Sequence, residues 1–452
     1  MAAGESRLFA GVARVTITPP VGTWQAGFGD RNRPSEGIHD DLFARALVLG
    51  DGSDEHRVAL VALDLIGLER DSVQRIRARI AEQTGIAGER VLLSCSHTHA
   101  GPSMLNLAGL GDGTTADQPA DAEYVTVTER AIAGAVQMAA GDLRPVTLSL
   151  GEGSAPFPVN RRRPVAGGGM VMEPNLDGVV DRRVGLLRVD HARRPDGPPL
   201  ALVYHLACHS TAMGSDNYLL SGDWPGQVNA FLESTSGAGR SDNGTVALFL
   251  QGCAGDIKPN VSTPEGRFRS ATWTELARLG RALGGELVRA GEQASPLPLG
   301  NGPVLAALTA FVTLPFAALP ERSRLEQELV GRSRDRGWAT VQLRQLDAGG
   351  LPSSLDAEVQ VLRIGALHLV AMPGEIFLEI GLRIRAALGE PTWSLGYANG
   401  LYLGYVPTPA ALAEGGYETQ AYRYWLHPAP LGPRSAELLE EAAQNAAAAG
   451  SG

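Results

Sequence analysis

Short apolar runs that end in polar residues constrain the fold of this chain most strongly. Five such runs of five or six residues are long enough for buried strands and too short for ordinary helices. They alternate with four longer segments in which apolar residues recur every three or four positions, as in helices that pack on a core. The runs are 58–63, 91–96, 201–206, 246–250 and 367–372, and the helical segments are 71–82, 120–140, 271–290 and 376–388.

This alternation predicts an α/β fold with mixed β-sheets and flanking helices. Polar side chains suited to catalysis follow the strand-like runs, and α/β proteins build their sites at strand ends and in the loops beyond them. We find no internal repeat and no clear linker. We therefore expect residues 1–452 to form a single catalytic domain, with a core of about 8–430 and a terminal helix and tail at 431–452. The polar side chains are those of Asp64, His97, His209, Asp256 and Glu375.

The composition narrows the class of protein and of partner. Hydrophobic residues make up 44% of the chain, enough for a substantial core. The net charge of -10, with no basic stripe, argues against nucleic acid and leaves a small-molecule substrate as the expected partner. No apolar run reaches the roughly 18 residues of a membrane span. Three cysteines and the lack of an apolar signal segment lead us to expect a reducing, cytoplasmic location.

Segment 96–99, Ser-His-Thr-His, follows the second apolar run. In extended backbone, residues two apart point to the same side, so the imidazoles of His97 and His99 can converge on one ion or one substrate. Two polar histidines in a loop are the alternative. His209 follows the third run and can supply another neutral imidazole to zinc. His205 lies inside that run, and we expect it to be a core histidine.

Two carboxylates stand beside expected helices, and each has a structural alternative. Asp223 precedes a short helical segment and is either its N-cap or a carboxylate that orients a histidine ligand. Glu375 lies where a strand turns into a helix. It either interacts favourably with the helix dipole or binds a metal as part of a mixed His/Glu set.

Two Gly-rich stretches complete the set of candidate segments. The turn at 251–260 contains Asp256 and Lys258, and its glycines let the backbone approach a ligand and offer free N–H groups to an oxyanion. The stretch at 398–418 contains tyrosines that either line a site or pack structurally. These are Tyr402, Tyr405 and Tyr417.

Taken together and in this order, these segments resemble the neutral/alkaline (non-lysosomal) ceramidase family. The similarity begins at 11–20, Gly-Val-Ala-Arg-Val-Thr-Ile-Thr-Pro-Pro, and continues to about Glu418. It includes 37–46 and the Val-Asn-Arg segment at 159–161. Each motif is weak by itself, but the ordered set is specific.

The resemblance implies a zinc amidase with one large ceramidase-like catalytic domain. In the family, residues at four of these positions hold the zinc ion, and three others surround the scissile group. The ligand positions are His97, His209, Glu375 and Tyr405, and the positions around the scissile group are His99, Arg161 and Tyr417. Tyr402 competes with Tyr405 because the spacing after Asn399 is one residue longer than the family pattern leads us to expect.

The sequence departs from the family pattern in two places. Lys258 stands where the family's Gly-Asp-x-Ser-Pro-Asn segment has a serine considered important for ceramide cleavage. The chain also ends soon after the last motif, without the family's C-terminal immunoglobulin-like domain. These departures argue against ceramide itself as the substrate and leave hydrolysis of an amide (N-acyl) bond as the expected activity.

The expected mechanism uses a zinc-bound water whose pKa is lowered towards about 7 and which attacks the acyl carbon. Asp256 and Asp223 would orient the ligands, and His99, Arg161 and Tyr417 would stabilise the oxyanion or the leaving group. Lys258 either binds an anionic part of a small substrate or is a solvated surface lysine.

Three other functions fit parts of the pattern. The same scaffold could hydrolyse an ester, a lactone or a glycosidic bond, since a fold does not fix the substrate. A barrel-type amidohydrolase would use His97 and His99 as paired ligands, but eight regular strand–helix units are not visible. A sugar- or lipid-binding module would hold a closed structural metal. Serine hydrolase chemistry fits poorly, because there is no Gly-x-Ser-x-Gly elbow.

Overall fold

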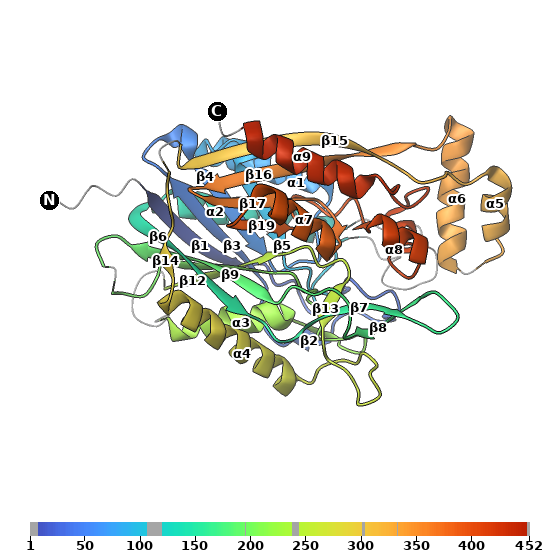
Figure 1. The fold of residues 1–452 in the computed structure, drawn as a ribbon, viewed down its shortest axis with the longest axis horizontal. Coiled ribbons are helices and arrows are strands. Elements are labelled where there is room, and N and C mark those ends of the chain that lie inside the picture. The colour runs from blue at the N-terminus through green and yellow to red at the C-terminus, as the bar shows by residue number, and fades with distance from the viewer. Residues whose placement is uncertain are drawn as a thin grey trace.

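Two β-sheets packed against each other form the centre of the fold (Figure 1). The computed structural model describes residues 8–105, 120–194, 196–236, 244–300, 303–331 and 333–449. Within these residues the larger sheet has nine strands and the second has four. In spatial order the larger sheet contains β12 (Val246–Gln251), β10 (Ala201–Leu206), β9 (Arg183–His191), β6 (Arg144–Ser154), β1 (Phe9–Thr16), β3 (Phe43–Gly50), β4 (Val58–Leu63) and β5 (Val91–Cys95), and β14 (Ser295–Pro296) pairs with β6. The second sheet contains β15 (Leu305–Pro315), β16 (Ser354–Ile364), β17 (Leu367–Ala371) and β19 (Thr392–Leu395).

Small sheets lie beside these two and carry parts of the candidate site. The pairs β4–β5 and β10–β12 of the large sheet are parallel, whereas most of its other pairs are antiparallel. The small sheets are β13 (Ile257–Pro259) with β7 (Pro158–Pro164) and β8 (Met170–Asn175), β11 (Leu219–Leu220) with β2 (Gly37–Ile38), and β18 (Glu375–Ile376) with β20 (Tyr405–Val406).

The apolar runs are continuous because they are buried on both faces. In β4, Val58, Leu60 and Ala62 belong to the core between the two sheets. The alternate residues, Ala59 and Val61 among them, face the core under the helices. A strand covered on both sides needs apolar residues at every position, which is the pattern from which the strand was predicted.

Helices cover the outer faces of both sheets (Figure 1). Helices α1 and α2 pack on the side of the large sheet formed by β1, β3, β4 and β5, and α3 and α4 cover β9, β10 and β12. Helices α7 and α9 cover the second sheet. The predicted class, mixed sheets with flanking helices, is therefore confirmed. The bounds are α1 Arg70–Thr84, α2 Ala122–Ala140, α3 Asp223–Thr235, α4 Trp273–Glu292, α7 Leu378–Leu388 and α9 Ser435–Ala449.

The predicted helices begin within two residues of the observed ones. The largest consequence is at 376–388, where the helix starts at Leu378 and the residues before it form the short strand β18. Glu375 is thus not in the first turn of a helix, which removes the basis of the helix-dipole alternative. The expected terminal helix is confirmed as α9, and 450–452 lie outside the described residues.

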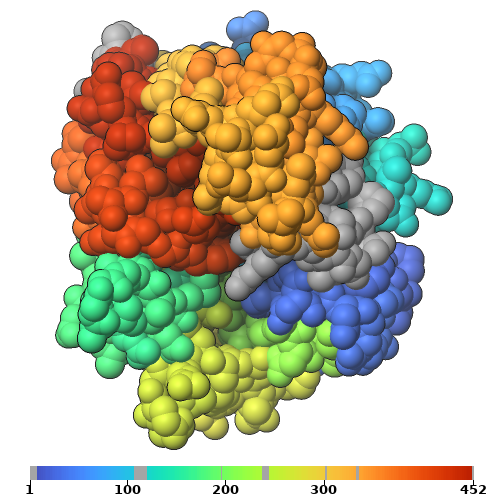
Figure 2. Space-filling view, turned by 90° about the vertical axis from the view of Figure 1, so that its right-hand side faces the viewer, coloured from blue at the N-terminus to red at the C-terminus, as the bar shows by residue number. Residues whose placement is uncertain are grey.

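A helical hairpin that the sequence patterns did not reveal stands at one end of the molecule (Figure 1). It consists of α5 (Arg322–Glu328) and α6 (Ser333–Ala348). Seen from that end, the hairpin (orange) borders the C-terminal segments (red), which include α8 (Pro409–Glu414) and the short 3-10 helix η4 (Ala421–Trp425) (Figure 2). Across the described part of the chain, none of the helices has the length and apolar character that a bilayer crossing requires.

Candidate active site

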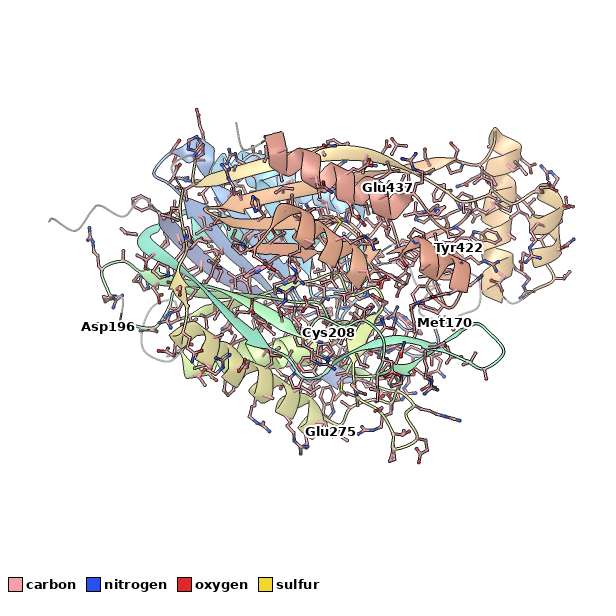
Figure 3. All side chains as sticks on the ribbon, in the orientation of Figure 1. Met170, Asp196, Cys208, Glu275, Tyr422 and Glu437 are labelled. Atoms are coloured by element: carbon pink, nitrogen blue, oxygen red, sulfur yellow. The ribbon has the colours of Figure 1, made fainter. Side chains whose placement is uncertain are left out.

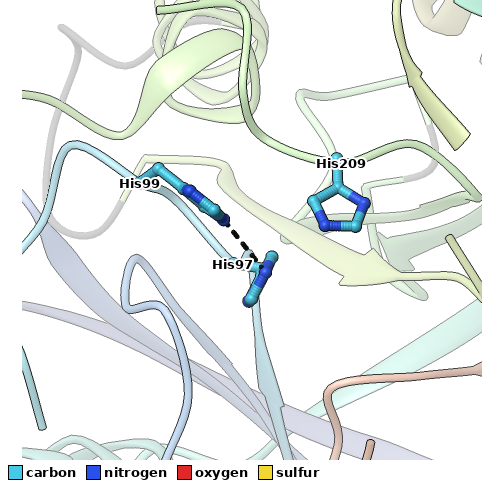
Figure 4. Close-up of side chains that lie close together, drawn as sticks. All are labelled: His97, His99 and His209. Atoms are coloured by element: carbon cyan, nitrogen blue, oxygen red, sulfur yellow. Dashed lines mark hydrogen bonds between the residues drawn. The ribbon is translucent and has the colours of Figure 1, made fainter. Parts of the chain in front are cut away.

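Three histidines from two separate strand ends meet at one point. His97 and His99 follow β5, and His209 follows β10. Each can direct one ring nitrogen to a common point, and these nitrogens lie within 4.8 Å of one another (Figure 4). The Nε2 atoms of His97 and His99 are 3.1 Å apart. The grouping is therefore dense enough in imidazole nitrogens to hold a metal ion.

Hydrogen bonds to the backbone fix the ring orientation of two of these histidines. The Nδ1 atom of His97 lies 2.6 Å from the carbonyl oxygen of Ile66, and that of His209 lies 2.6 Å from the carbonyl oxygen of Ala254. A carbonyl only accepts, so each Nδ1 carries the proton and each Nε2 keeps its lone pair. Metal-binding histidines are typically held in this way by a second, outer partner.

Glu375 faces both of these free ring nitrogens. Its Oε2 atom lies 3.1 Å from His209 Nε2 and 3.5 Å from His97 Nε2, and the Glu375 side chain is only 3% exposed. Burial raises the pKa of Glu375, and positive charge on His97 and His209, when these rings are protonated, holds it well below its usual range. Burial lowers the pKa of His209 to about 4. Neutral imidazoles and an ionised carboxylate are the protonation states that a divalent metal needs, so the donor set fits zinc.

Glu375 and Tyr405 are brought together by backbone pairing. They are directly opposite each other in the parallel pair β18–β20. The hydroxyl of Tyr405 accepts a hydrogen bond of 2.9 Å from Nη2 of Arg161, which extends from β7. The Nη1 atom of the same guanidinium is 3.3 Å from His209 Nε2, and its Nε donates to Glu418 at 2.8 Å. Arg161 therefore connects the tyrosine to the histidine side of the site.

The competing tyrosine lies elsewhere. The hydroxyl of Tyr402 accepts a hydrogen bond of 3.2 Å from the backbone N–H of Glu358 in β16 of the second sheet. Tyr405 lines the candidate cavity, and within the described residues Tyr402 does not. The placement favours Tyr405 as the tyrosine ligand.

A cavity opens directly over the histidines and Glu375. Its polar side includes His99, Tyr405 and Tyr417. Much of the remaining wall is apolar or aromatic, and it includes two more aromatic side chains from η4, Tyr424 and Trp425. The cavity therefore places the candidate metal ligands beside walls that suit a hydrocarbon chain. The other apolar or aromatic side chains of the wall are Ala26, Phe28, Ile66, Leu105 and Leu401.

The Gly-rich turn contributes structure around the cavity. Asp256 accepts hydrogen bonds from the N–H of Leu378 at 2.9 Å and from Nδ2 of Asn160 at 3.1 Å, so its carboxylate ties α7 to β7. The ammonium of Lys258 lies 4.8 Å from the ring centre of Phe268. Neither Asp256 nor Lys258 is among the described residues that line the cavity.

Other polar residues at the strand ends have structural contacts. Asp64 pairs with the buried Arg45 at 2.7 Å. Asp223 accepts hydrogen bonds from backbone N–H groups in the loop after His209. Asp223 is the first residue of α3, and the N-cap of that helix is Gly222, so Asp223 is not the N-cap. Asp223 thus supports the loop that carries His209. His205 lies 3.2 Å from the carbonyl of Ser394 and is partly buried within β10, so it has a structural hydrogen-bond partner, as expected of a core histidine.

Tyr397 is a site residue that the sequence patterns did not reveal. Its ring centre lies 4.3 Å from that of His97, and its hydroxyl lies 3.3 Å from His209 Nδ1 and 3.5 Å from Glu375 Oε2. The side chain is completely buried. The sequence signal for it is its position directly before the Gly-rich stretch at 398–418.

Comparisons with known proteins show similarity over most of the chain. The family profile described as neutral/alkaline non-lysosomal ceramidase, N-terminal, matches residues 9–272. The neutral ceramidase of Mycobacterium tuberculosis is 26% identical over 87% of this chain and 70% of that protein, and that of Pseudomonas aeruginosa is 24% identical over 88% and 65%. The crystal structure of the Pseudomonas aeruginosa neutral ceramidase has a TM-score of 0.73 at 21% identity, over 98% of this chain and 74% of that one. That likeness supports the fold.

Proposed function

Because this chain belongs to the neutral/alkaline non-lysosomal ceramidase family, we propose that it is a zinc-dependent hydrolase of an N-acyl amide bond. In this proposal His97, His209, Glu375 and Tyr405 hold the ion, and His99 faces the substrate. The chain spans 70% and 65% of the lengths of the two bacterial relatives, so the substrate of this chain is part of the proposal.

One observation carries the proposal. Two imidazole lone pairs, fixed by backbone carbonyls, point at the same ionised carboxylate oxygen, at 3.1 and 3.5 Å. Three acceptors that face one another in a buried site repel, and the Arg161 guanidinium, 3.3 Å from His209 Nε2, offsets this on the His209 side. A bound zinc ion would relieve this repulsion, polarise an acyl oxygen and lower the pKa of water.

The residues around the ligands suit the remaining steps of amide hydrolysis. Burial lowers the pKa of His99 well below its ordinary value, so the ring is neutral at pH 7. It can accept the proton that the attacking water loses and pass it to the leaving amine. Tyr417 is protonated at neutral pH and can donate to the carbonyl oxygen as negative charge develops there. Arg161 keeps Tyr405 in place through its 2.9 Å hydrogen bond.

The cavity wall favours a substrate with an apolar acyl chain. Phe28, Ile66, Leu401 and Trp425 line the cavity together with the polar groups. The relatives carry the name neutral ceramidase, which makes an N-acylated lipid a natural first substrate to test. Lys258 replaces the family serine, and a chain-length series of N-acyl amines would determine whether ceramide or a smaller amide is preferred.

The decisive test measures zinc content and turnover in His97→Ala and Glu375→Ala. Loss of an outer partner of a metal ligand typically costs 10–100-fold, so loss of a ligand itself should reduce turnover by more than about 100-fold. His205→Ala is a matched control, because it removes a packed histidine that bonds to the Ser394 carbonyl outside the site. Wild-type zinc content and turnover in both ligand variants would refute the proposal.

A substrate panel tests the type of bond. Esters, lactones and glycosides with matched acyl or aryl groups should be cleaved more slowly than the corresponding N-acyl amine. Faster cleavage of any of these classes would show that the enzyme prefers that type of bond to an N-acyl amide.

A further inference from the structure

The short helix η4 has two faces with different surroundings. Tyr424 and Trp425 belong to the cavity wall. Tyr422 and Arg423 contact the α5–α6 hairpin instead, and Tyr422 lies between α8 and this hairpin in the view of Figure 3. One turn of chain therefore connects the hairpin to the wall of the proposed substrate cavity.

Helix α6 holds the chain at the end of η4 through two side-chain donors. Trp338 Nε1 donates to the carbonyl of His427 at 2.7 Å, and Gln342 Nε2 donates to the carbonyl of Leu426 at 2.8 Å. Leu426 has a φ of 55°, a conformation that a leucine adopts only when its surroundings impose it. The two donors bind at and just after this residue, so they stabilise the turn that ends η4.

Arg423 makes the second connection between η4 and the hairpin. Its guanidinium lies 4.7 Å from the ring centre of Trp338 and forms ion pairs with Asp335 of α6 and Glu328 of α5. The ring of Tyr422 packs edge-on against Trp338, with 5.8 Å between ring centres. The hairpin thus contacts η4 and the residues just after it through an edge-on ring contact, ion pairs, and hydrogen bonds from side chains to backbone carbonyls.

The opposite face of η4 packs tightly into the site. A Cβ atom at Gly404 would lie 2.9 Å from the ring of Trp425, so this backbone leaves no room for a larger residue. The ring of Trp425 lies edge-on to that of Tyr405, 5.9 Å away. The ring of Tyr424 is 6.4 Å from that of Tyr417. A shift of η4 would therefore move the aromatic wall relative to both tyrosines.

We propose that the α5–α6 hairpin sets the substrate selectivity of the cavity, with Trp338 and Gln342 as positioning residues that hold Tyr424 and Trp425 in the wall. The hairpin stands outside the packed sheets and helices, which fits a part that shapes the site more than it stabilises the fold (Figure 1). This inference rests on the proposed function, because selectivity is defined by the N-acyl substrate.

The test uses the double variant Trp338→Phe with Gln342→Met. Phe keeps an aromatic ring and Met keeps the length of the side chain, but both backbone-directed donors are lost. Thr340→Val is the matched control, since the Thr340 hydroxyl bonds only within α6, to the carbonyl of Arg336 at 2.8 Å. We expect KM for a long-chain N-acyl amine to rise about tenfold in the double variant, from the loss of hydrogen bonds that fix the wall. KM for the N-acetyl analogue and kcat for both should change less than about twofold.

Hydrogen exchange gives a readout that does not depend on activity. The amides of Leu426 and His427 donate to the carbonyls of Arg423 and Tyr422 within the η4 turn. Peptides that cover 421–427 should exchange faster in the double variant and at the wild-type rate in Thr340→Val. Unchanged exchange, or equal rises in KM for the long and short substrates, would overturn the inference. If the wild-type protein cleaved no N-acyl amine, the proposed function would fail, and the exchange result would still decide whether the hairpin holds the wall.

Discussion

Glu418 balances two buried arginines beside the cavity, and its replacement by glutamine should destabilise the protein severely. Oε1 accepts from Nε of Arg161 at 2.8 Å, and Oε2 accepts from Nη1 of Arg162 at 2.7 Å. The three side chains are 2%, 4% and 7% exposed, so water cannot replace the missing charge. Breaking a buried ion pair by removing one partner costs about 3–5 kcal/mol. We expect Glu418→Gln to lower the free energy of unfolding at pH 7 by this amount, measured by urea denaturation.

Glu414 provides a control on one of the same arginines. Its carboxylate lies 3.2 Å from Nη2 of Arg162, but its side chain is 45% exposed. Exposed pairs are worth about 0–1 kcal/mol because solvent screens them. Glu414→Gln should therefore lower the free energy of unfolding by no more than about 1 kcal/mol. If Glu418→Gln cost no more than Glu414→Gln, burial would not be the source of the effect.

The stability that Glu418 contributes should decrease as the pH falls. Burial would raise the pKa of Glu418, but Arg161 and Arg162 outweigh it and lower the pKa in the folded protein. The unfolded chain therefore binds a proton first as the pH falls. The stabilisation is fully present above the unfolded pKa of about 4.3 and is lost as the pH falls towards the folded value. The difference between wild type and Glu418→Gln should be constant above about pH 5 and shrink below about pH 4.

Three further predictions concern the close packing at Gly27, the partly buried His205, and Lys258, which stands at the position of the family serine. Gly27 has a φ of 95°, and a Cβ atom there would lie 2.3 Å from the ring of His99. Gly27→Ala should therefore reduce turnover at least tenfold, whereas Gly29→Ala, whose Cβ atom meets nothing within 4 Å, should not reduce it. Equal turnover in the two variants would contradict this packing. Burial lowers the pKa of His205 to about 4. The unfolded histidine is therefore protonated first as the pH falls from 6.5, and wild type should lose about 3 kcal/mol more than His205→Gln between pH 6.5 and 4 in urea titrations. Lys258→Ser should leave kcat/KM for an N-acetyl amine within about threefold of the wild-type value, because Lys258 does not line the described cavity. A larger fall would show that Lys258 contributes to the site.

Strands that are buried on both faces could be predicted from the sequence, and half-exposed strands could not. The run 58–63 is entirely buried and matches β4 at both ends. The long strand β15 has many partly exposed positions and a mixture of alanine and threonine, so it carries neither a continuous apolar run nor a clean alternation. A strand can be recognised in the sequence when it is buried throughout, as a continuous apolar run, or when burial alternates strictly along it.

The α5–α6 hairpin shows a second limit. Its apolar core contains Leu325, Trp338 and Ala339, with Tyr422 packed against it. The helices themselves have few apolar positions that would predict this contact, because the partner is a short segment of chain 84 to 89 residues away. Its place beside the cavity follows from tertiary contacts that no local pattern encodes.

At the site, the histidine pair was predicted correctly as close neighbours, but for a reason that does not hold. Two-residue spacing places side chains on one side only in extended backbone, whereas β5 ends at Cys95 and His97 has a φ of 59°. Asp223, Tyr397 and Asn399 share this left-handed conformation, which costs a residue other than glycine about 1 kcal/mol or more. Glycine would relieve the strain but would remove the imidazole, the loop-binding carboxylate, the phenol and the amide that bonds the Leu93 N–H at 3.0 Å.

The strain at these positions is balanced by backbone contacts from distant segments. The N–H of His97 bonds to the carbonyl of Leu65 at 2.9 Å, that of Tyr397 to Gly374 at 2.9 Å, and that of Asn399 to Leu93 at 2.7 Å. Each bond joins a strained residue to a different strand or to the loop after one, so the conformation depends on the assembled sheets. Sequence patterns can therefore name the side chains that carry the chemistry, while the backbone geometry that aims them is a property of the completed fold.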